Sequence, residues 1–365
     1  MNYQLSSNRL HWMDATRCLA CFAVVLVHVT YLGGNGGDRA IAIYGYYAVA
    51  SASIVYFMLT GALTLWRPKP IGAFLRERLV RVFVPMLIWT AITLAIDCAT
   101  GRMAWSDLPA ALAQMPVKPQ VPFFWFIYMA MGIYVFVPIL ATWLQQASRR
   151  QVELLLAVWG AALCVPALTL VWPAFGNLLS EEFGILFYAQ GYMGLMLLGY
   201  YLRRWGKIEH WRWGHIVGAA ALLCVPLVLF LTHWHTATFL HRLSPNIVAL
   251  GALVVIAAQS IRFARWSHRA LYVGSQLTFG IYLTHRIVTQ SVIIPLFESW
   301  CPNYWWGIPL ATLLCVGICG LIAYALSLTP VAVWLGCRVR PYSIEQKRAL
   351  QDGNDGKNAH SDAIS

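Results

Sequence analysis

Three ionisable side chains lie in one apolar stretch near the N-terminus, WMDATRCLACFAVVLVHVTYL, which runs from Trp12 to Leu32 and contains Asp14, Arg17 and His28. A helix needs about 20 residues to cross a bilayer, and ionisable groups inside such a span usually face a cavity or a partner. At about 100° and 1.5 Å per residue, the step from Arg17 to His28 makes about three turns and rises about 16 Å, so both side chains project from one face. Asp14 lies about one turn before Arg17, near that face. This spacing predicts a catalytic histidine served by a charged entrance.

A second interpretation gives these residues no catalytic role. Long side chains such as that of Arg17 can extend from the end of a span to the lipid headgroups, and His28 can be capped near the opposite surface. Both interpretations stay open, but ionisable groups along one stripe of a span favour a cavity.

Three arginines lie where the third hydrophobic segment begins, in the sequence FLRERLVRVFVPMLIW, at positions Arg76, Arg78 and Arg81. Residues three apart in an α-helix are neighbours, so Arg78 and Arg81 are expected on one face. Guanidinium groups bind phosphate oxygens through paired hydrogen bonds, which suits an anionic substrate from the cytoplasm. Lipid headgroups and the usual excess of basic residues in cytoplasmic loops explain the same arginines without a substrate.

Two later segments supply candidate supporting residues. Trp125 and Tyr128 begin the fourth hydrophobic segment, where an interfacial belt of aromatic rings also explains them. His285 and Arg286 lie close to the middle of the ninth segment, where an arginine costs about 2.5 to 3.5 kcal/mol on insertion scales. Arg286 is therefore expected to face a pore or to form an ion pair, for which the candidate acids are Asp97, Glu181, Glu182 and Glu298.

Two groups of potential metal ligands lack the spacing of a metal site. His233, His235 and His241 crowd one loop, but no third ligand of suitable spacing lies near the H-x-H pair. Cys18 and Cys21 form C-x-x-C inside a span without a second pair, so they are interpreted as small buried hydrophobic residues. We therefore expect no metal.

The composition is that of a polytopic membrane protein. The chain of 365 residues is 59% hydrophobic and 11% charged, with a mean hydropathy of +0.62 and 17 tryptophans. A net charge of +12 would suggest nucleic-acid binding in a soluble protein. Here the basic residues cluster between hydrophobic segments, as the positive-inside rule predicts, so membrane lipid rather than nucleic acid is the expected partner.

The hydrophobic segments predict an all-α fold with about ten transmembrane helices. With the N-terminus in the cytoplasm, most lysines and arginines fall on the cytoplasmic side, which also places the C-terminus there. Residues 1–335 are expected to form one transmembrane domain and the polar residues 336–365 a disordered cytoplasmic tail. The expected spans are residues 12–33, 41–66, 79–99, 121–144, 152–172, 185–202, 214–232, 245–261, 271–297 and 307–335.

Several of these motifs together resemble the acyltransferase-3 family of integral-membrane enzymes, which O-acetylate surface polysaccharides and related glycans. The resemblance covers nearly all of the expected spans, and the Arg-x10-His pattern of the first span is its most specific part. The matching pieces are Trp12, Asp14, Arg17 and His28, then YFMLTG at 56–61, Arg78 with Arg81, FWFIYMAMGIYVFVPIL at 124–140, LGYYL at 198–202 and TFGIYLTH at 278–285.

The resemblance implies that His28 is catalytic and that Arg17, Arg78 and Arg81 handle acyl-CoA. Some positions depart from the family pattern: Phe123 or Phe124 stands where many members have a histidine, and Arg286 where a proline is usual. Val55 and Tyr56 also stand where a proline commonly precedes the YFMLTG region. These departures concern the acceptor side more than the donor chemistry.

The sequence therefore predicts an O-acetyltransferase of the bacterial inner membrane that uses acetyl-CoA as donor and a cell-surface or lipid-linked glycan as acceptor. It resembles members without a fused hydrolase-like domain, so the membrane part is expected to act alone or with a separate partner. His28 would either take the proton of the attacking hydroxyl or be acylated itself. Arg17 would neutralise CoA phosphates or the developing oxyanion.

Two other classes of function compete with this prediction. A transporter or exporter of lipid-linked glycans could line its conduit with intramembrane arginine and histidine, and it would act without consuming acetyl-CoA. A structural membrane protein leaves Arg17, His28 and Arg286 unexplained. The set of cytoplasmic arginines with a single histidine farther along the span favours an enzyme with two substrates.

Overall fold

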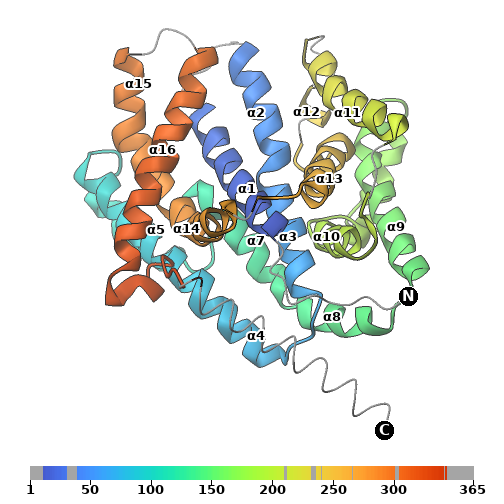
Figure 1. The fold of residues 1–365 in the computed structure, drawn as a ribbon, viewed down its shortest axis with the longest axis horizontal. Helices are drawn as coiled ribbons and strands as arrows, with labels where there is room; N and C mark the ends of the chain where they lie inside the picture. The colour runs from blue at the N-terminus through green and yellow to red at the C-terminus, as the bar shows by residue number, and fades with distance from the viewer. Residues whose placement is uncertain are drawn as a thin grey trace.

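The described part of the chain is built from helices and turns, without a β-strand, as the all-α prediction requires (Figure 1). The computed structural model describes residues 11–30, 39–208, 212–231, 236–239, 241–264, 266–300, 304–340 and 342. Its α-helices are α1 (His11–Thr30), α2 (Arg39–Ser51), α3 (Ser53–Thr64), α4 (Ile71–Arg78), α5 (Val84–Ala99), α6 (Leu108–Gln114), α7 (Trp125–Tyr134), α8 (Val137–Gln146), α9 (Arg149–Leu168), α10 (Met193–Trp205), α11 (Trp213–Leu231), α12 (Thr236–Phe239), α13 (Pro245–Ser260), α14 (Ser267–Val288), α15 (Ile294–Trp300) and α16 (Tyr304–Ser327).

Shorter segments join some of these helices. Two π-helical segments, η2 (Leu79–Phe83) and η7 (Thr289–Ile293), join α4 to α5 and α14 to α15. The 3-10 segments are η3 (Trp105–Asp107), η4 (Pro122–Phe124), η5 (Pro173–Leu179), η6 (Phe187–Ala189) and η8 (Pro330–Val333).

Helix α1 lies in the middle of the molecule and contacts α2, α3, α13, α14 and α16 (Figure 1). Its closest polar link is to α14, where Ser275 Oγ donates a hydrogen bond to Asp14 Oδ1 at 2.6 Å. About two turns farther along α1, Cys21 Sγ lies 3.5 Å from the carbonyl oxygen of Thr278, and about two turns beyond Cys21 the rings of His28 and His285 are 5.0 Å apart. The two helices therefore run in the same direction side by side, and α14 contacts α1 at Asp14, Cys21 and His28.

Small residues allow neighbouring helices to approach closely, as is usual in membrane bundles. Helices α3 and α10 cross at Gly61 and Gly199: a Cβ on Gly61 would clash with the backbone of Met196, and one on Gly199 with the backbone of Met58. This crossing fixes α3, which in turn contributes Tyr56 and Thr60 to the site described below.

Five helical segments of the described chain are long and apolar enough to span a membrane, namely His11–Thr30, Ile43–Thr64, Ile71–Ala99, Arg149–Leu168 and Tyr304–Ser327. A sixth span results if Pro122–Tyr134 and Val137–Gln146, which are bent by 54° relative to each other, are counted together. The shorter apolar helices Trp213–Cys224 and Pro245–Ser260 coincide with two further predicted spans. The chain is thus a multi-pass membrane protein, while the count of ten spans and the cytoplasmic position of both termini stay predictions.

Some predicted spans differ from the observed helices. The predicted span 121–144 is broken after Tyr134, and its second half begins at Val137 with a proline in the first turn, where a missing amide hydrogen is tolerated. The predicted span 185–202 becomes regular helix only at Met193, because Gly191 has φ +106° and cannot continue a right-handed helix.

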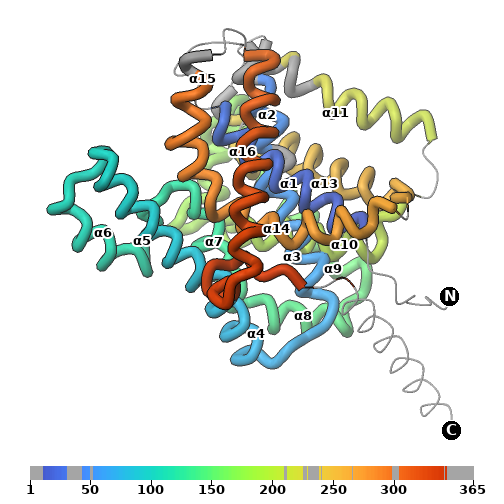
Figure 2. The backbone as a smooth tube through the Cα atoms, turned by 60° about the vertical axis from the view of Figure 1, so that its left-hand side comes forward, coloured from blue at the N-terminus to red at the C-terminus, as the bar shows by residue number. Residues whose placement is uncertain are grey.

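The chain after α16 turns back along α14 instead of leaving the bundle (Figure 2). Residues 334–340, here called the return segment, are held at both ends. Trp89 Nε1 donates to the carbonyl oxygen of Leu335 at 3.0 Å, and the Gln276 side chain exchanges two hydrogen bonds with the backbone of Arg340, at 2.9 and 3.2 Å. The side chains of Trp89 on α5 and Gln276 on α14 therefore hold this segment at Leu335 and Arg340. The predicted domain boundary at residue 335 and the disordered tail stay predictions. Residues 343–365 of the predicted tail lie outside the described residues.

Candidate active site

A cavity of about 580 Å³ runs beside α1 and takes residues from both halves of the chain. Volumes of this size are typical of sites for small molecules and cofactors. Arg17 and His28 of α1 both line it, about 16 Å apart along the helix axis, as their helical spacing requires. The other walls come from α2, α3, α4, α7 and α14, from η2 and η4, from the residues before α13, and from the return segment.

Arg17, Arg78 and Arg338 line the cavity and are here called together the arginine end. The guanidinium of Arg78 lies against two aromatic rings, 5.1 Å from the centroid of Phe74 and 5.3 Å from that of Tyr134. Its Nε atom is buried and has no hydrogen-bond partner among the described residues. In the described part of the chain no carboxylate pairs with any of these three guanidinium groups, and none lines the cavity.

Arg76 and Arg81, which were predicted to join Arg78 in binding the donor, do not line this cavity. Arg81 Nη1 instead contacts Glu77 Oε1 at 2.6 Å, with the arginine side chain 53% exposed. The expectation that Arg78 and Arg81 share a face assumed α-helical geometry, whereas Leu79–Phe83 is π-helical. A π-helix has more residues per turn, so a step of three no longer returns to the same face.

The opposite end, here called the histidine end, is built from stacked rings. The imidazole of His28 lies 3.8 Å from the ring of Phe123, with an interplanar angle of 22°. Tyr282 fixes this arrangement, because its hydroxyl donates to the carbonyl oxygen of Phe123 at 2.7 Å. The Nδ1 atom of His28 is buried without a hydrogen-bond partner among the described residues, so a ring nitrogen remains for chemistry.

His285 supports this end from outside the cavity lining. Its side chain is fully buried, with its ring 5.0 Å from that of His28 and 5.6 Å from that of Phe123. Its Nδ1–H donates to the carbonyl oxygen of Tyr282 at 2.5 Å, which fixes the orientation of the imidazole ring. His285 can therefore position His28 and Phe123 without contacting a molecule in the cavity.

Two predicted aromatic residues of α7 have different roles. Trp125 lines the cavity near the histidine end, and the guanidinium of Arg242 lies 4.2 Å above its ring, a cation–π contact. Tyr128 does not line it, and its hydroxyl donates instead to the carbonyl oxygen of Met115. Trp125 is thus available to a substrate, whereas Tyr128 anchors the loop after α6.

His241 also lines the cavity, next to Arg242. Its predicted neighbours His233 and His235 lie outside the described residues. Among the residues that the structure describes, no group of three histidine, cysteine, aspartate or glutamate side chains is placed to hold a metal ion.

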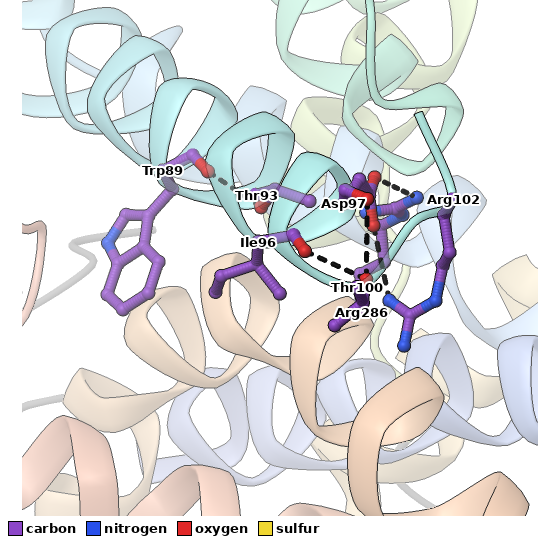
Figure 3. Close-up of polar contacts among 7 residues, drawn as sticks. All are labelled: Trp89, Thr93, Ile96, Asp97, Thr100, Arg102 and Arg286. Atoms are coloured by element: carbon purple, nitrogen blue, oxygen red, sulfur yellow. Dashed lines mark hydrogen bonds and ion pairs between the residues drawn. The ribbon is translucent and has the colours of Figure 1, made fainter. Parts of the chain in front are cut away.

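The two other predicted charged residues, Asp14 and Arg286, stabilise the fold around the cavity. Asp14 is buried, and Ser275 on α14 donates a hydrogen bond to it. Arg286 Nη2 lies 2.8 Å from Asp97 Oδ2, and Arg102 Nη1 lies 3.2 Å from the other oxygen of the same carboxylate (Figure 3). Arg286 therefore faces an acidic partner, one of the two alternatives expected from its place in a span.

Several cavity residues had no role in the sequence prediction. Gln276 and Tyr282 lie on α14, where the match to TFGIYLTH gave a local signal, and Tyr56 begins the YFMLTG motif. Arg338 gave no such signal, since it was counted among the basic residues of the cytoplasmic tail. Its place in the cavity depends on the return of the chain along α14, which no local pattern predicts.

A helical membrane protein whose cavity is lined by several guanidinium groups and by an imidazole with a ring nitrogen unpaired among the described residues has the parts needed for transfer of an activated group. A sequence model of the acyltransferase-3 family, described as an acyltransferase domain, matches residues 10–324. The chain therefore belongs to the acyltransferase-3 family, and its activity is that of an acyltransferase. No curated protein sequence and no solved structure matches the chain.

Proposed function

We propose that this acyltransferase moves an acetyl group from acetyl-CoA to a hydroxyl of a cell-surface or lipid-linked glycan. The observation that carries the proposal is the single cavity lined by Arg17 at one end and His28 at the other. The donor would bind with its phosphates at the arginine end, and the acceptor would enter at the histidine end. By the positive-inside rule, the arginine end faces the cytoplasm of a bacterial inner membrane.

The residues of the arginine end fit the phosphate groups of CoA. Three guanidinium groups lie there without a carboxylate partner in the described part of the chain, and Arg78 Nε is buried without a hydrogen bond. Phosphate oxygens satisfy such donors through short, charge-assisted hydrogen bonds. A glycan hydroxyl would satisfy them less well, because it carries no charge.

The residues of the histidine end suit proton transfer. Bound acetyl-CoA supplies a thioester whose C–S bond breaks as the C–O bond of the new ester forms. His28 takes the proton of the attacking hydroxyl and returns it to the CoA sulfur, so CoA leaves as a thiol. Phe123 and His285 hold the imidazole in place during both transfers.

The test is transfer of radiolabelled acetyl groups by the purified protein in lipid nanodiscs. Replacing His28→Ala should reduce transfer to background, while His215→Ala, which changes an exposed histidine of α11 outside the cavity lining, should leave it unchanged. Unchanged turnover in the His28 variant would remove the proposal. Label retained on the wild-type protein without acceptor would favour an acetyl-imidazole intermediate over direct transfer.

The acceptor can be identified in cells. Mass spectrometry of surface glycans, with and without this protein, should show a mass difference of one acetyl group. Movement of a glycan across vesicles without consumption of acetyl-CoA would instead support a transporter.

A further inference from the structure

The return segment contributes one residue, Arg338, to the wall of the cavity. Cys337 is fully buried, and the backbone on either side of it is fixed by Trp89 at Leu335 and by Gln276 at Arg340. Between these anchors Gly336 has φ +68°, a conformation that favours glycine, and a Cβ there would lie 2.7 Å from the ring of Phe279. A segment held at this many points presents its side chains in a defined direction.

The side chain presented at the arginine end is that of Arg338. It lines the cavity although the residue is exposed, so it lies at a mouth where the cavity meets the outside. Gln276, whose side chain holds the backbone of Arg340, lines the same cavity. The guanidinium of Arg338 can therefore reach a ligand that enters past α14.

We propose that Arg338 binds a phosphate group of the acyl donor, a role that the R-x-x-R motif would otherwise assign to Arg81. This inference rests on the proposed function, since it assumes that acyl-CoA enters at the arginine end. Arg81 does not line the cavity, and its guanidinium contacts Glu77 at 2.6 Å. Arg338 has no carboxylate partner in the part of the chain that the structure describes.

Charge supports the same assignment. Arg17, Arg78 and Arg338 place three positive charges around one end of a cavity that no aspartate or glutamate of the described residues lines. Guanidinium groups without a carboxylate partner are suited to bind an anion that carries several negative charges. The phosphates of CoA supply such charges.

The experiment measures binding of CoA to the full-length protein in nanodiscs by isothermal titration calorimetry. Replacing Arg338→Ala should weaken CoA binding about ten-fold, the loss expected for a hydrogen bond to a charged group. Arg340→Ala is the matched control, because it removes the same charge from the same segment while its backbone bonds to Gln276 remain. Arg81→Ala should also leave CoA binding unchanged.

Three outcomes would overturn the inference: wild-type affinity in the Arg338 variant, an equal loss in the Arg340 variant, or a loss confined to the Arg81 variant. If the alanine variant melts at a lower temperature without ligand, Arg338→Lys and Arg338→Gln are compared instead. The inference then requires lysine, which keeps the charge, to bind CoA more tightly than glutamine. Failure of the wild-type protein to bind CoA would remove the proposed function as well, so the two failures are distinguishable.

Discussion

The two ends of the cavity hold their side chains in different ways. At the histidine end, His28 stacks on Phe123, whose backbone is fixed by the hydroxyl of Tyr282. At the arginine end, the charges come from three separate elements, α1, α4 and the return segment. Stacked rings hold one another without a ligand, whereas guanidinium groups without a carboxylate partner are satisfied best by an anion. The first end is therefore organised to position a reacting group, and the second to bind an anion.

The same contrast separates two kinds of arginine in this chain. Arg286 and Arg81 each have a carboxylate within 2.8 Å, at Asp97 and Glu77, and neither lines the cavity. Arg17 and Arg78 line it, and no carboxylate of the described residues pairs with them. Of these four arginines, the two that pair with a carboxylate lie outside the cavity lining, and the two without one can be reached by a substrate in the cavity.

The largest effect is expected at the ion pair between Arg286 and Asp97, where the two side chains are 14% and 9% exposed. Replacing Asp97→Ala leaves the Arg286 charge in a span without its partner, which typically destabilises a protein by about 3 to 5 kcal/mol. We expect a clear fall in melting temperature, measured by scanning fluorimetry in nanodiscs, with little change in CoA affinity of the folded fraction.

Arg102→Ala is the control, because Arg102 binds the same carboxylate from a side chain that is 35% exposed. Its effect should be small, as for other partly exposed pairs. Equal melting temperatures for the two variants would show that the buried pair does not stabilise the fold. The double replacement Asp97→Leu with Arg286→Met should recover part of the loss, since the buried Arg286 charge is removed together with its partner and only the partly exposed Arg102 loses its carboxylate.

The second effect concerns donor binding. Replacing Arg78→Ala should raise KM for acetyl-CoA about ten- to a hundred-fold with a smaller change in kcat, because hydrogen bonds to charged groups contribute about 1.5 to 3 kcal/mol. Arg81→Ala should change KM little, since Arg81 is paired with Glu77 outside the cavity. Steady-state kinetics at saturating acceptor measures both, and equal effects would mean that the two arginines do not differ in the way the structure indicates.

The sequence predicted those parts of the site that depend on local helix geometry. Arg17 and His28 lie on one helix, and the period of an α-helix alone places them on a common face. The sequence also predicted that Arg286 faces a pore or an acidic partner, because it lies within a span. Only the fold showed that the partner is Asp97 and not another of the candidate acids.

Two other features could not be predicted because they depend on non-local structure. The π-helical segment Leu79–Phe83 separates Arg81 from Arg78, and nothing in the sequence LVRVF marks it. Arg338 reaches the cavity only because Trp89 and Gln276, far away in the sequence, hold the return segment. Two predicted spans were also too long. The span predicted at 121–144 is broken between α7 and α8, and the span predicted at 185–202 becomes regular helix only where α10 begins, at Met193.

The smallest effect is expected at Phe123, where a replacement should change kcat without changing CoA affinity. Replacing Phe123→Ala removes the ring stacked on His28 at 3.8 Å. Aromatic contacts of this kind contribute about 0.5 to 1.5 kcal/mol, so kcat should fall about two- to twelve-fold as the imidazole becomes less well positioned. CoA affinity should not change, because Phe123 lies at the histidine end.

Phe123→His keeps a planar ring and should restore most of kcat, whereas Phe123→Leu, which has similar bulk without a ring, should not. If leucine restored activity as well as histidine, filling the space would be the role of Phe123, and stacking would not be what positions His28.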